Sequence, residues 1–545
     1  MEQNKALLTR RSFTGIVGAA AAGAALVGLT GCGGGGGTTG GTTGGGATGD
    51  PVSGGELRIA INRTISAQAL DPIYIDSTTA DQVCQNYGDT IIQESADQSE
   101  YLPGIATDWT ISDDGITYTF TIRDDVHFQP GEYQDGRLLT AEDVAYSLTR
   151  AKGYWCNYLY FLESAEATDD KTVVCTLTEP NATFLHELVH SSTIMVPKEE
   201  VEGWGEEFGM HPISTGPYKV IEHSPDQRTV LEKNANYWNG TPYLDRVVYS
   251  IVTEDAQAIN GIMTGELDAT LTLNGQLVQQ AEQAGIVVAQ AEEPRVAYMG
   301  FNLSDPDLGK QEVRDAIAMA INREEIAAGV YANGDGEISY LPVPKMSWGY
   351  DESLESLAPA YDPEGAKELL ASAGYSEGDL TLRLSVGTTD AYVRAATLIQ
   401  EQCAAIGVNI DIRSGLSSAE LTDLYINNGV QLWINGQGGS ADPATFVGYF
   451  LSSDKIGTNY NAFRYESAEA DELIAEGLAL VDQDERKGVY DELIKMAMET
   501  NIGVFYATTN LSWGISPKVH GYVQENKAVM YLCAPDRGIN VWKEA

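Results

Sequence analysis

Two histidines and a glutamate stand at the spacing of a zinc peptidase site. The run His186-Glu187-Leu188-Val189-His190 matches the HExxH pattern. On a continuous helix this spacing puts both imidazoles on one face as zinc ligands and leaves the glutamate as a general base. Glu206 or Glu207 offers a third ligand. A zinc metallopeptidase is therefore one hypothesis, and the alternative is a helix that happens to carry two histidines four residues apart.

The cysteines show no metal or redox motif. Cys84, Cys156, Cys175, Cys403 and Cys533 are widely scattered, and the chain contains no CxxC or CxxCH. Zinc ribbons, thioredoxin-like sites and c-type haem attachment therefore lack their sequence marks. One or two disulfides remain open, with the pairing unspecified, but buried thiols are the expectation for most of these residues. A nucleophile elbow, a phosphate-binding loop and a dinucleotide fingerprint are also absent, so no cofactor is expected.

The sixth cysteine, Cys32, closes an export signal. Residues 1–31 combine a basic start with a short apolar stretch that is too short and too rich in Ala and Gly for a stable membrane span. Thr9-Arg10-Arg11-Ser12-Phe13 adds a twin-arginine pattern, and Leu29-Thr30-Gly31-Cys32 resembles a bacterial lipobox. We expect an acylated Cys32 that holds the chain on the outer face of the cytoplasmic membrane. Twin-arginine export also suits a cofactor-carrying oxidoreductase, an alternative without supporting metal or flavin motifs.

The exported part is strongly acidic and starts with a tether. Residues 32–53 are almost only Gly, Thr, Ala and Ser, and such a chain reaches roughly 25 Å at about 5–6 Å × √n. Removing residues 1–31 takes away three basic residues and one acidic residue, so the net charge moves from −45 to −47. That acidity makes nucleic acid an unsuitable partner and biases capture toward cationic solutes.

Strands and helices are predicted to alternate beyond the tether, without an internal repeat. Residues 117–123 alternate with period two, and Thr140 begins a helix with a near capping box. This mixture predicts α/β lobes, and the length of 545 residues predicts at least two of them. The expected strands are 57–61, 117–123, 172–177, 229–232, 296–302, 381–386, 409–413, 430–434 and 503–506, and the expected helices are 79–92, 140–150, 255–264, 311–331, 363–373, 391–406, 468–480 and 484–500.

A series of short landmarks carries a resemblance to a known family. The landmarks include Asp108-Trp109, Thr140-Ala141-Glu142-Asp143-Val144, Ser214-Thr215-Gly216-Pro217-Tyr218, Gly265-Glu266-Leu267-Asp268 and Asp442-Pro443, in this order. From about residue 54 to 545 the chain resembles family 5 extracellular solute-binding proteins, the oligopeptide-, dipeptide- and nickel-binding receptors of ABC importers. Any one landmark alone would be a weak signal, but the ordered set is specific.

The resemblance implies a two-lobed α/β protein with the periplasmic-binding-protein type II fold and a central ligand cleft. It places residues 54–93, 213–301 and 508–545 in lobe I, 94–212 in an extra subdomain on it, and 302–507 in lobe II. The segments Tyr298–Leu303 and Gly503–Thr509 would cross between the lobes as hinges. The implied function is that of a monomeric receptor, not an enzyme, which captures a peptide or peptide-like solute and delivers it to the permease subunits. A surface-attached recognition protein without a transporter remains an alternative.

Two departures from the family pattern bear on the ligand. Peptide-binding relatives place an aspartate for the peptide ammonium four residues before the proline of Asp442-Pro443, where this chain has Gly439. Dipeptide receptors place an arginine for the carboxylate near the end of the strand before helix 391–406, where Val386-Gly387-Thr388-Thr389 has none. These differences weaken a dipeptide interpretation and favour longer peptides held through their main chain, or a neutral or cationic solute.

The candidate ligand-binding residues combine an aromatic wall with paired amides. Trp433 would supply the wall, and neighbouring amides would recognise the peptide main chain. The alternative places Trp433 in the core of lobe II and the Gly-rich run after it in a surface loop. The full candidate set is Trp433, Asn435, Gln437, Gly439, Tyr460, Asn461 and Arg464 on lobe II, with Thr78 and Asp81 facing them from lobe I.

Overall fold

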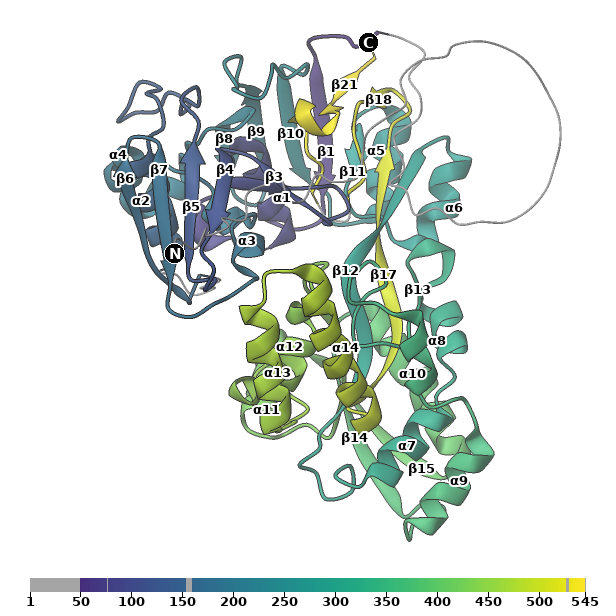
Figure 1. Cartoon of the computed structure of the whole chain (residues 1–545). Coiled ribbons are helices and arrows are strands. Elements are labelled where there is room, and N and C mark those ends of the chain that lie inside the picture. Colours follow the sequence, from purple (N-terminus) through teal and green to yellow (C-terminus); the bar gives the residue numbers. More distant parts are fainter. Residues whose placement is uncertain (1–49, 76, 153–158, 526–528, 545) are drawn as a thin grey trace, which may run out of the picture.

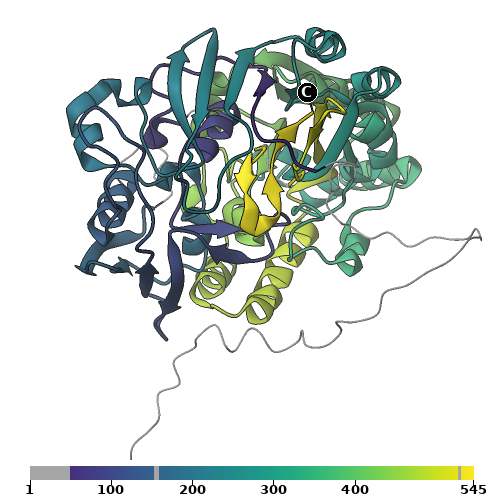
Figure 2. The ribbon, with the colours of Figure 1, turned by 90° about the horizontal axis from the view of Figure 1, so that it is seen from above.

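The computed structural model describes residues 50–75, 77–152, 159–525 and 529–544. The predicted signal peptide, Cys32, Cys156 and nearly all of the predicted tether lie outside the described residues. The described chain builds two lobes, joined by two long strands, and a subdomain attached to the upper lobe (Figure 1). Seen from above, the upper lobe and the subdomain lie in front and the lower lobe lies behind them (Figure 2).

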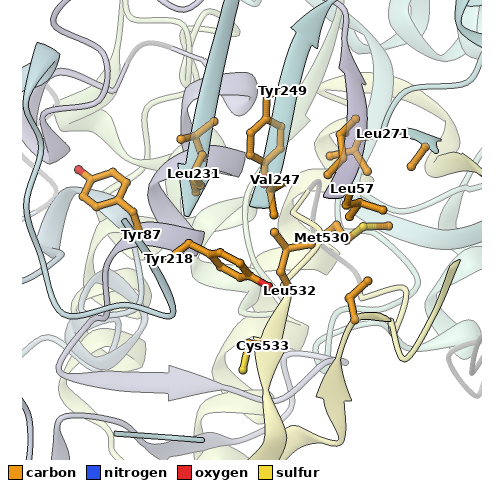
Figure 3. Packing of buried hydrophobic residues seen from close by; sticks show 14 of the residues in the cluster. Leu57, Tyr87, Tyr218, Leu231, Val247, Tyr249, Leu271, Met530, Leu532 and Cys533 are labelled. Carbon is orange, nitrogen blue, oxygen red and sulfur yellow. The ribbon is translucent and has the colours of Figure 1, made fainter. Parts of the chain in front are cut away.

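Lobe I contains a mixed sheet whose central strands are parallel. Strand β1 (Glu56–Ile61) pairs in parallel with β10 (Arg246–Ile251) and with β11 (Ala269–Thr270). Antiparallel strands β9 (Arg228–Lys233) and β8 (Tyr218–Ser224) extend the sheet from β10. The core packs aliphatic and aromatic side chains of these strands against α1 (Thr78–Tyr87) and the C-terminal segment around Met530 and Leu532 (Figure 3). Helices α5 (Asp255–Thr264) and α6 (Gly275–Gln283) form a smaller core beside it.

Lobe II is a sheet covered by helices on both faces. Its parallel strands are β14 (Leu380–Gly387), β15 (Val408–Leu416) and β16 (Leu432–Gly438). One face packs against α7 (Gln311–Ala320), α8 (Arg323–Val330), α9 (Pro363–Ser372) and α10 (Asp390–Ala405). The other face packs against α11 (Ser418–Ile426), α12 (Val447–Leu451), α13 (Ala468–Ala479) and α14 (Gln483–Thr500), the yellow-green group in Figure 1.

Two strands continue from one lobe into the other. Strands β12 (Val287–Phe301) and β17 (Gly503–Ile515) pair antiparallel along their length, with a register shift between Glu292 and Val296. Residues 287–292 of β12 lie opposite the C-terminal half of β17, which also pairs with β11 in lobe I. Residues 295–301 pair with β16 in lobe II. The predicted hinge segment Gly503–Thr509 lies within β17, whereas Tyr298–Leu303 covers the end of β12, where it pairs with β16 of lobe II, and two residues beyond it.

The subdomain has its own four-stranded antiparallel sheet and its own core. The strand order is β4 (Ala106–Ile111), β5 (Thr117–Ile122), β7 (Thr172–Leu177) and β6 (Leu162–Asp169). Helix α2 (Ala141–Lys152) packs on this sheet, while α3 (Phe184–Glu187) and α4 (Lys198–Trp204) follow β7. The subdomain also contacts lobe II, because the Ala182 N–H donates to the Leu478 carbonyl at 2.8 Å.

Short elements complete the described chain. They are β2 (Ile92–Glu94), β3 (Tyr101–Pro103), β13 (Gly336–Ile338), β18 (Val519–His520), β19 (Cys533–Ala534), β20 (Ile539–Asn540), β21 (Trp542–Lys543) and the 3-10 turns η2 (Pro72–Tyr74), η3 (Ser191–Thr193), η4 (Gly205–Met210), η5 (Ala332–Gly334), η6 (Glu352–Leu357), η7 (Pro443–Thr445), η8 (Ser453–Lys455) and η9 (Pro535–Arg537). Among the helices that the structure describes, none is long and apolar enough to cross a membrane.

Two of the predicted helices differ from the observed ones by more than two residues at one end or are interrupted. The helix expected over 79–92 ends at Tyr87, because Gly88 is extended and a side chain there would collide with Ile194 and Ser214. The helix expected over 311–331 is broken into α7 and α8 at Asn322, whose side chain accepts from the Glu325 N–H and caps the second helix.

Candidate functional site

The topology brings the carboxyl ends of two sets of parallel strands to face each other. Because β12 runs from lobe I into lobe II and β16 is antiparallel to it, β14, β15 and β16 all end at the edge that faces lobe I. In the same way β17 runs toward lobe I, so its antiparallel neighbour β11 ends toward lobe II. Strands β1 and β10 run parallel to β11 and therefore also end toward lobe II. Ligands of α/β sheets bind outside the carboxyl ends of strands. We call these two facing borders the interlobe edges.

The candidates at the end of β16 lie on the interlobe edge of lobe II. Asn435 is partly exposed and its side-chain amide donates to Asn459 at 3.1 Å, while its own oxygen accepts the Gly436 N–H. Gln437 is buried and donates to the Gly438 carbonyl. Gly439 is exposed and donates its N–H to the Pro294 carbonyl at 2.9 Å. The structure therefore brings Asn435, Gln437 and Gly439 together.

The next three candidates lie on the loop before α13. Tyr460 is partly exposed and its ring packs against Tyr449, with 4.6 Å between centroids. Asn461 is fully buried and its amide donates to the carbonyls of Ser452 and Tyr465, each at 2.8 Å. Arg464 has a positive φ of 57° and donates to the Tyr425 carbonyl. Asn461 and Arg464 hold the loop, and Tyr460 is its partly exposed member.

Trp433 lies in the core of lobe II. Its side chain is 0% exposed and packs between Phe463, at 5.0 Å between ring centroids, and Tyr425, at 5.9 Å. A side chain on Gly300 of the neighbouring strand would collide with the indole, so that glycine makes room for it. In this arrangement the ring supports β16 from within the core instead of forming an accessible wall.

The two candidates of lobe I lie at the start of α1. Ser77 caps this helix by accepting the Ala80 N–H, and Thr78, the first helical residue, is exposed. Asp81 is partly buried and accepts a hydrogen bond from the Ser191 hydroxyl of the subdomain. Asp81 therefore links lobe I to the subdomain, whereas Thr78 keeps an accessible surface.

The HExxH run does not form the helix that a zinc peptidase needs. Helix α3 ends at Glu187, and His190 has an extended backbone with φ −74° and ψ 142° and caps the turn η3. The His186 Nδ1 lies 3.5 Å from the Glu94 carboxylate, whereas the His190 ring contacts Ser192. Among the described residues, no group of three His, Cys, Asp or Glu side chains is placed to hold a metal ion. The metallopeptidase interpretation is therefore not supported by this geometry.

Glu187 instead belongs to the contact between the subdomain and lobe II. Its side chain is buried, and burial raises its pKa to about 7, with the nearby His186 lowering it and the Asp442 charge of lobe II raising it further. The Glu94 carboxylate of the subdomain lies next to His186, the residue before Glu187. A carboxyl group that titrates near neutrality therefore lies between the two bodies.

The described cysteines are buried thiols. Cys84, Cys175, Cys403 and Cys533 are buried, and burial raises the pKa of the last three to about 12. This confirms the expectation of buried thiols for these four residues.

Sequence reasoning missed a charged pair on the crossing strand β12. Arg295 lies opposite Gly438 in the β12–β16 register, and its Nε donates to Glu293 at 2.9 Å. The Tyr392 hydroxyl, on the first turn of α10, lies near the same guanidinium. No local pattern marks Arg295, because only the pairing of distant strands brings it beside the end of β16.

This architecture defines a class of two-lobed solute-binding proteins, and comparisons with known proteins agree. The family described as bacterial extracellular solute-binding proteins, family 5 (middle), matches residues 100–458, so the chain belongs to this family. The heme-binding protein A of Haemophilus influenzae is 29% identical over 490 residues, which cover 83% of this chain and 87% of that protein. The dipeptide-binding protein of Escherichia coli is 25% identical over 488 residues, covering 84% and 90%.

Solved structures show the same fold. The structure of HbpA2 from Haemophilus parasuis covers 90% of this chain and 100% of that one, with 24% identity and a TM-score of 0.79. The binding protein DppA of Helicobacter pylori, solved in complex with the peptide STSA, covers 91% and 99%, with 26% identity and a TM-score of 0.74. The expected mixed α/β fold of periplasmic-binding-protein type II is thereby confirmed.

Proposed function

We propose that this protein is a lipid-anchored, extracytoplasmic receptor of an ABC importer that captures a peptide or peptide-like solute between its lobes and delivers it to the permease. One observation carries the proposal: the carboxyl ends of the parallel strands in both lobes face each other across β12 and β17. A ligand between these edges exchanges its contacts with water for contacts with both lobes, and these contacts form only when the lobes close. Binding is thereby coupled to closure. Relatives named for dipeptide and glutathione binding support the ligand class.

The ligand-facing residues in this proposal are a subset of the sequence candidates. Asn435, Gly439 and Tyr460 on lobe II, with Thr78 on lobe I, have accessible surface at or near the interlobe edges. Arg464 and Asp81 are also partly exposed, but their side chains bond to the Tyr425 carbonyl and to Ser191. An amide and the N–H groups at a strand end suit the main chain of an extended peptide. Trp433, Asn461 and Arg464 would act through this surface by holding it in place.

A panel of ligands tests the proposal by thermal unfolding. Tetrapeptides and longer peptides should raise the Tm, dipeptides should do so weakly, and hemin should have no effect. Asn435→Ala should reduce the peptide-induced shift. Asn409→Ala is the matched control, because Asn409 is an exposed asparagine near the opposite end of β15. A shift with hemin alone, or none with any peptide, would contradict the proposed ligand class.

Localisation is tested separately from binding. Cys32→Ala should release the protein from the membrane fraction, and replacing Arg10 and Arg11 by lysine should keep it inside the cell. Uptake of the bound peptide should fall when the gene is deleted. Unchanged uptake with intact binding would favour a surface recognition protein that has no transporter.

A further inference from the structure

We propose that Arg295 binds a carboxylate group of the captured solute, such as the C-terminal carboxylate of a peptide, at the interlobe edge of lobe II. This inference rests on the proposed function and names the group that the site selects. Arg295 would bind the ligand carboxylate in place of the arginine that the family resemblance leads one to expect in Val386-Gly387-Thr388-Thr389, where this chain has none.

The position of Arg295 is set by strand pairing. In the antiparallel register of β12 and β16, Arg295 lies opposite Gly438, the last residue of β16. The next residue along, Gly439, donates its N–H to the carbonyl of Pro294. Arg295 therefore lies at the edge of lobe II that faces lobe I, within one residue of the segment proposed to bind the peptide main chain.

Two glycines make room for the guanidinium. A Cβ at Gly438 would lie 3.2 Å from Arg295 Nη2, and a Cβ at Gly436 would lie 3.3 Å from Arg295 Cδ and would collide with the Tyr392 hydroxyl. The end of β16 thus carries no side chain on this face, and the arginine and the tyrosine occupy the space. The Arg295 side chain remains 34% exposed, so a solute can reach it.

The Arg295 guanidinium is held in place by two hydrogen bonds and keeps further N–H groups for a ligand. Nε donates to Glu293 at 2.9 Å and Nη1 donates to the Gly436 carbonyl at 3.1 Å. Of the five N–H groups of an arginine, these bonds use two, and the Tyr392 hydroxyl lies near the same group. A fixed arginine that keeps further N–H groups suits a carboxylate, because the planar fork can bind both carboxylate oxygens.

Glu293 orients Arg295 without enclosing it. One Glu293 oxygen accepts from Arg295, and the other accepts from the Thr509 hydroxyl at 2.6 Å. Glu293 is thus tied to β17, and it fixes the guanidinium from one side. A ligand carboxylate would approach the guanidinium from the other side. When the lobes close, water is excluded from this contact, and the attraction between the two charges becomes stronger.

The cationic side chains beside the end of β16 favour Arg295 over Arg394. Two more cations lie on the loop that carries Tyr460, where Arg464 donates to the Tyr425 carbonyl and Lys455 lies over the Tyr449 and Tyr160 rings. In the described segments 293–295, 387–394, 416–420 and 435–442, the cationic side chains are Arg295 and Arg394. Arg394 lies on α10 and its Nη2 donates to the Val330 carbonyl of α8, which directs it toward the helices. Arg295 instead contacts the backbone of β16 itself.

A matched pair of probes tests the inference by calorimetry. The probes are Ser-Thr-Ser-Ala and a randomised tetrapeptide library, each with a free and with an amidated C-terminus. The wild-type protein should bind the free acids at least about tenfold more tightly than the amides, because only the acids carry the charge that an arginine pairs with. Arg295→Gln should abolish this preference and leave binding of the amides unchanged. Arg383→Gln, at an exposed arginine on β14, is the matched control and should behave like the wild type.

Two further variants separate ligand recognition from folding. Arg295→Lys keeps the charge but loses the fork, so the preference should shrink without vanishing. Glu293→Gln keeps an oxygen that can accept from Arg295 Nε but removes the negative charge beside the guanidinium, so the preference should be preserved or increase. If Arg295→Gln keeps the preference, or if Arg394→Gln removes it instead, the inference is wrong while the proposed function stands. If the wild type binds the acids and the amides equally, the inference is also wrong while the proposed function stands. If the wild type binds no peptide, both the inference and the proposed function are wrong.

Discussion

Arg486 of α14 donates two hydrogen bonds to the Asp442 carboxylate, at 2.6 and 3.1 Å, and both side chains are buried. The Arg486 Nε donates to the Gly477 carbonyl of α13, and Asp442 also accepts the Ala444 N–H in turn η7. This ion pair therefore joins the segment after β16 to helices α13 and α14. The Asp442-Pro443 landmark is explained by this structural role.

Breaking the pair by removing one partner should strongly destabilise lobe II. Arg486→Ala leaves the Asp442 carboxylate buried without its partner, at a cost of about 3–5 kcal/mol in the free energy of unfolding. Urea unfolding followed by fluorescence measures the change. The exposed Lys367–Glu364 pair supplies the control, since Lys367→Ala should leave the midpoint almost unchanged. Equal effects of the two substitutions would contradict the role assigned to Asp442 and Arg486.

Glu187 should make stability depend on pH between about 4.5 and 7. Its pKa in the folded protein is about 7, against an ordinary value of 4.5, so the folded state holds the proton more tightly. The stabilisation is complete below the lower value and is lost as the pH rises through the higher one, on the order of 3 kcal/mol in total.

A substitution isolates this contribution from those of the other carboxylates. Glu187→Gln should match the wild type near pH 4.5 and exceed it in stability at pH 8. Glu163→Gln, at an exposed glutamate, controls for the loss of one negative charge. If the stability difference between the wild type and the Glu187→Gln variant stays constant across this pH range, the assignment is refuted.

Trp433 should be needed for stability more than for ligand contact. Because the indole is fully buried, Trp433→Ala should lower the free energy of unfolding by about 3–5 kcal/mol. Trp433→Phe fills part of the space and should recover much of the loss. With ligand present, both variants should still show a peptide-induced Tm shift. Loss of that shift in a stable Trp433→Phe protein would place the ring in the binding surface.

Replacing Gly439 by aspartate should not create the ammonium site that the family resemblance leads one to expect at this position. A Cβ there would collide with the Thr445 hydroxyl, which accepts the Ser440 N–H and donates to the Asp442 carbonyl, and would lie 2.9 Å from the Phe446 ring. Gly439→Asp should therefore lower the Tm by several degrees without adding affinity for dipeptides. Adding Thr445→Ala should relieve part of the loss. A gain of dipeptide binding by Gly439→Asp alone would show that the loop accommodates the anchor.

Sequence patterns predict those elements whose signals are local. The strand Thr172–Leu177 and the helix Asp255–Thr264 have their predicted limits, because alternation and helical periodicity are visible within a few residues. The break at Asn322 escapes prediction because a capping asparagine inside a continuous helical pattern looks like one more polar position. The HExxH motif matches in spacing, but the helix ends at Glu187 and turn η3 follows it.

The site is predictable only in part. The family resemblance draws attention to residues 433–443, and the structure places the end of β16 within this run at the interlobe edge. Burial separates the members of the run: Trp433 faces the core, whereas Asn435 is partly exposed. Arg295 escapes notice because its neighbours Gly436 and Gly438 lie about 140 residues away in the chain. Such long-range pairing leaves no trace in local sequence.

Native mass spectrometry of the protein, purified without denaturation from its own cells, tests the central claim most directly. We expect a folded protein that carries a noncovalent ligand, released on activation as peptide masses with free C-terminal carboxylates. Protein that carries stoichiometric zinc or hemin instead, or that is empty and gains no mass from any peptide offered, would contradict it.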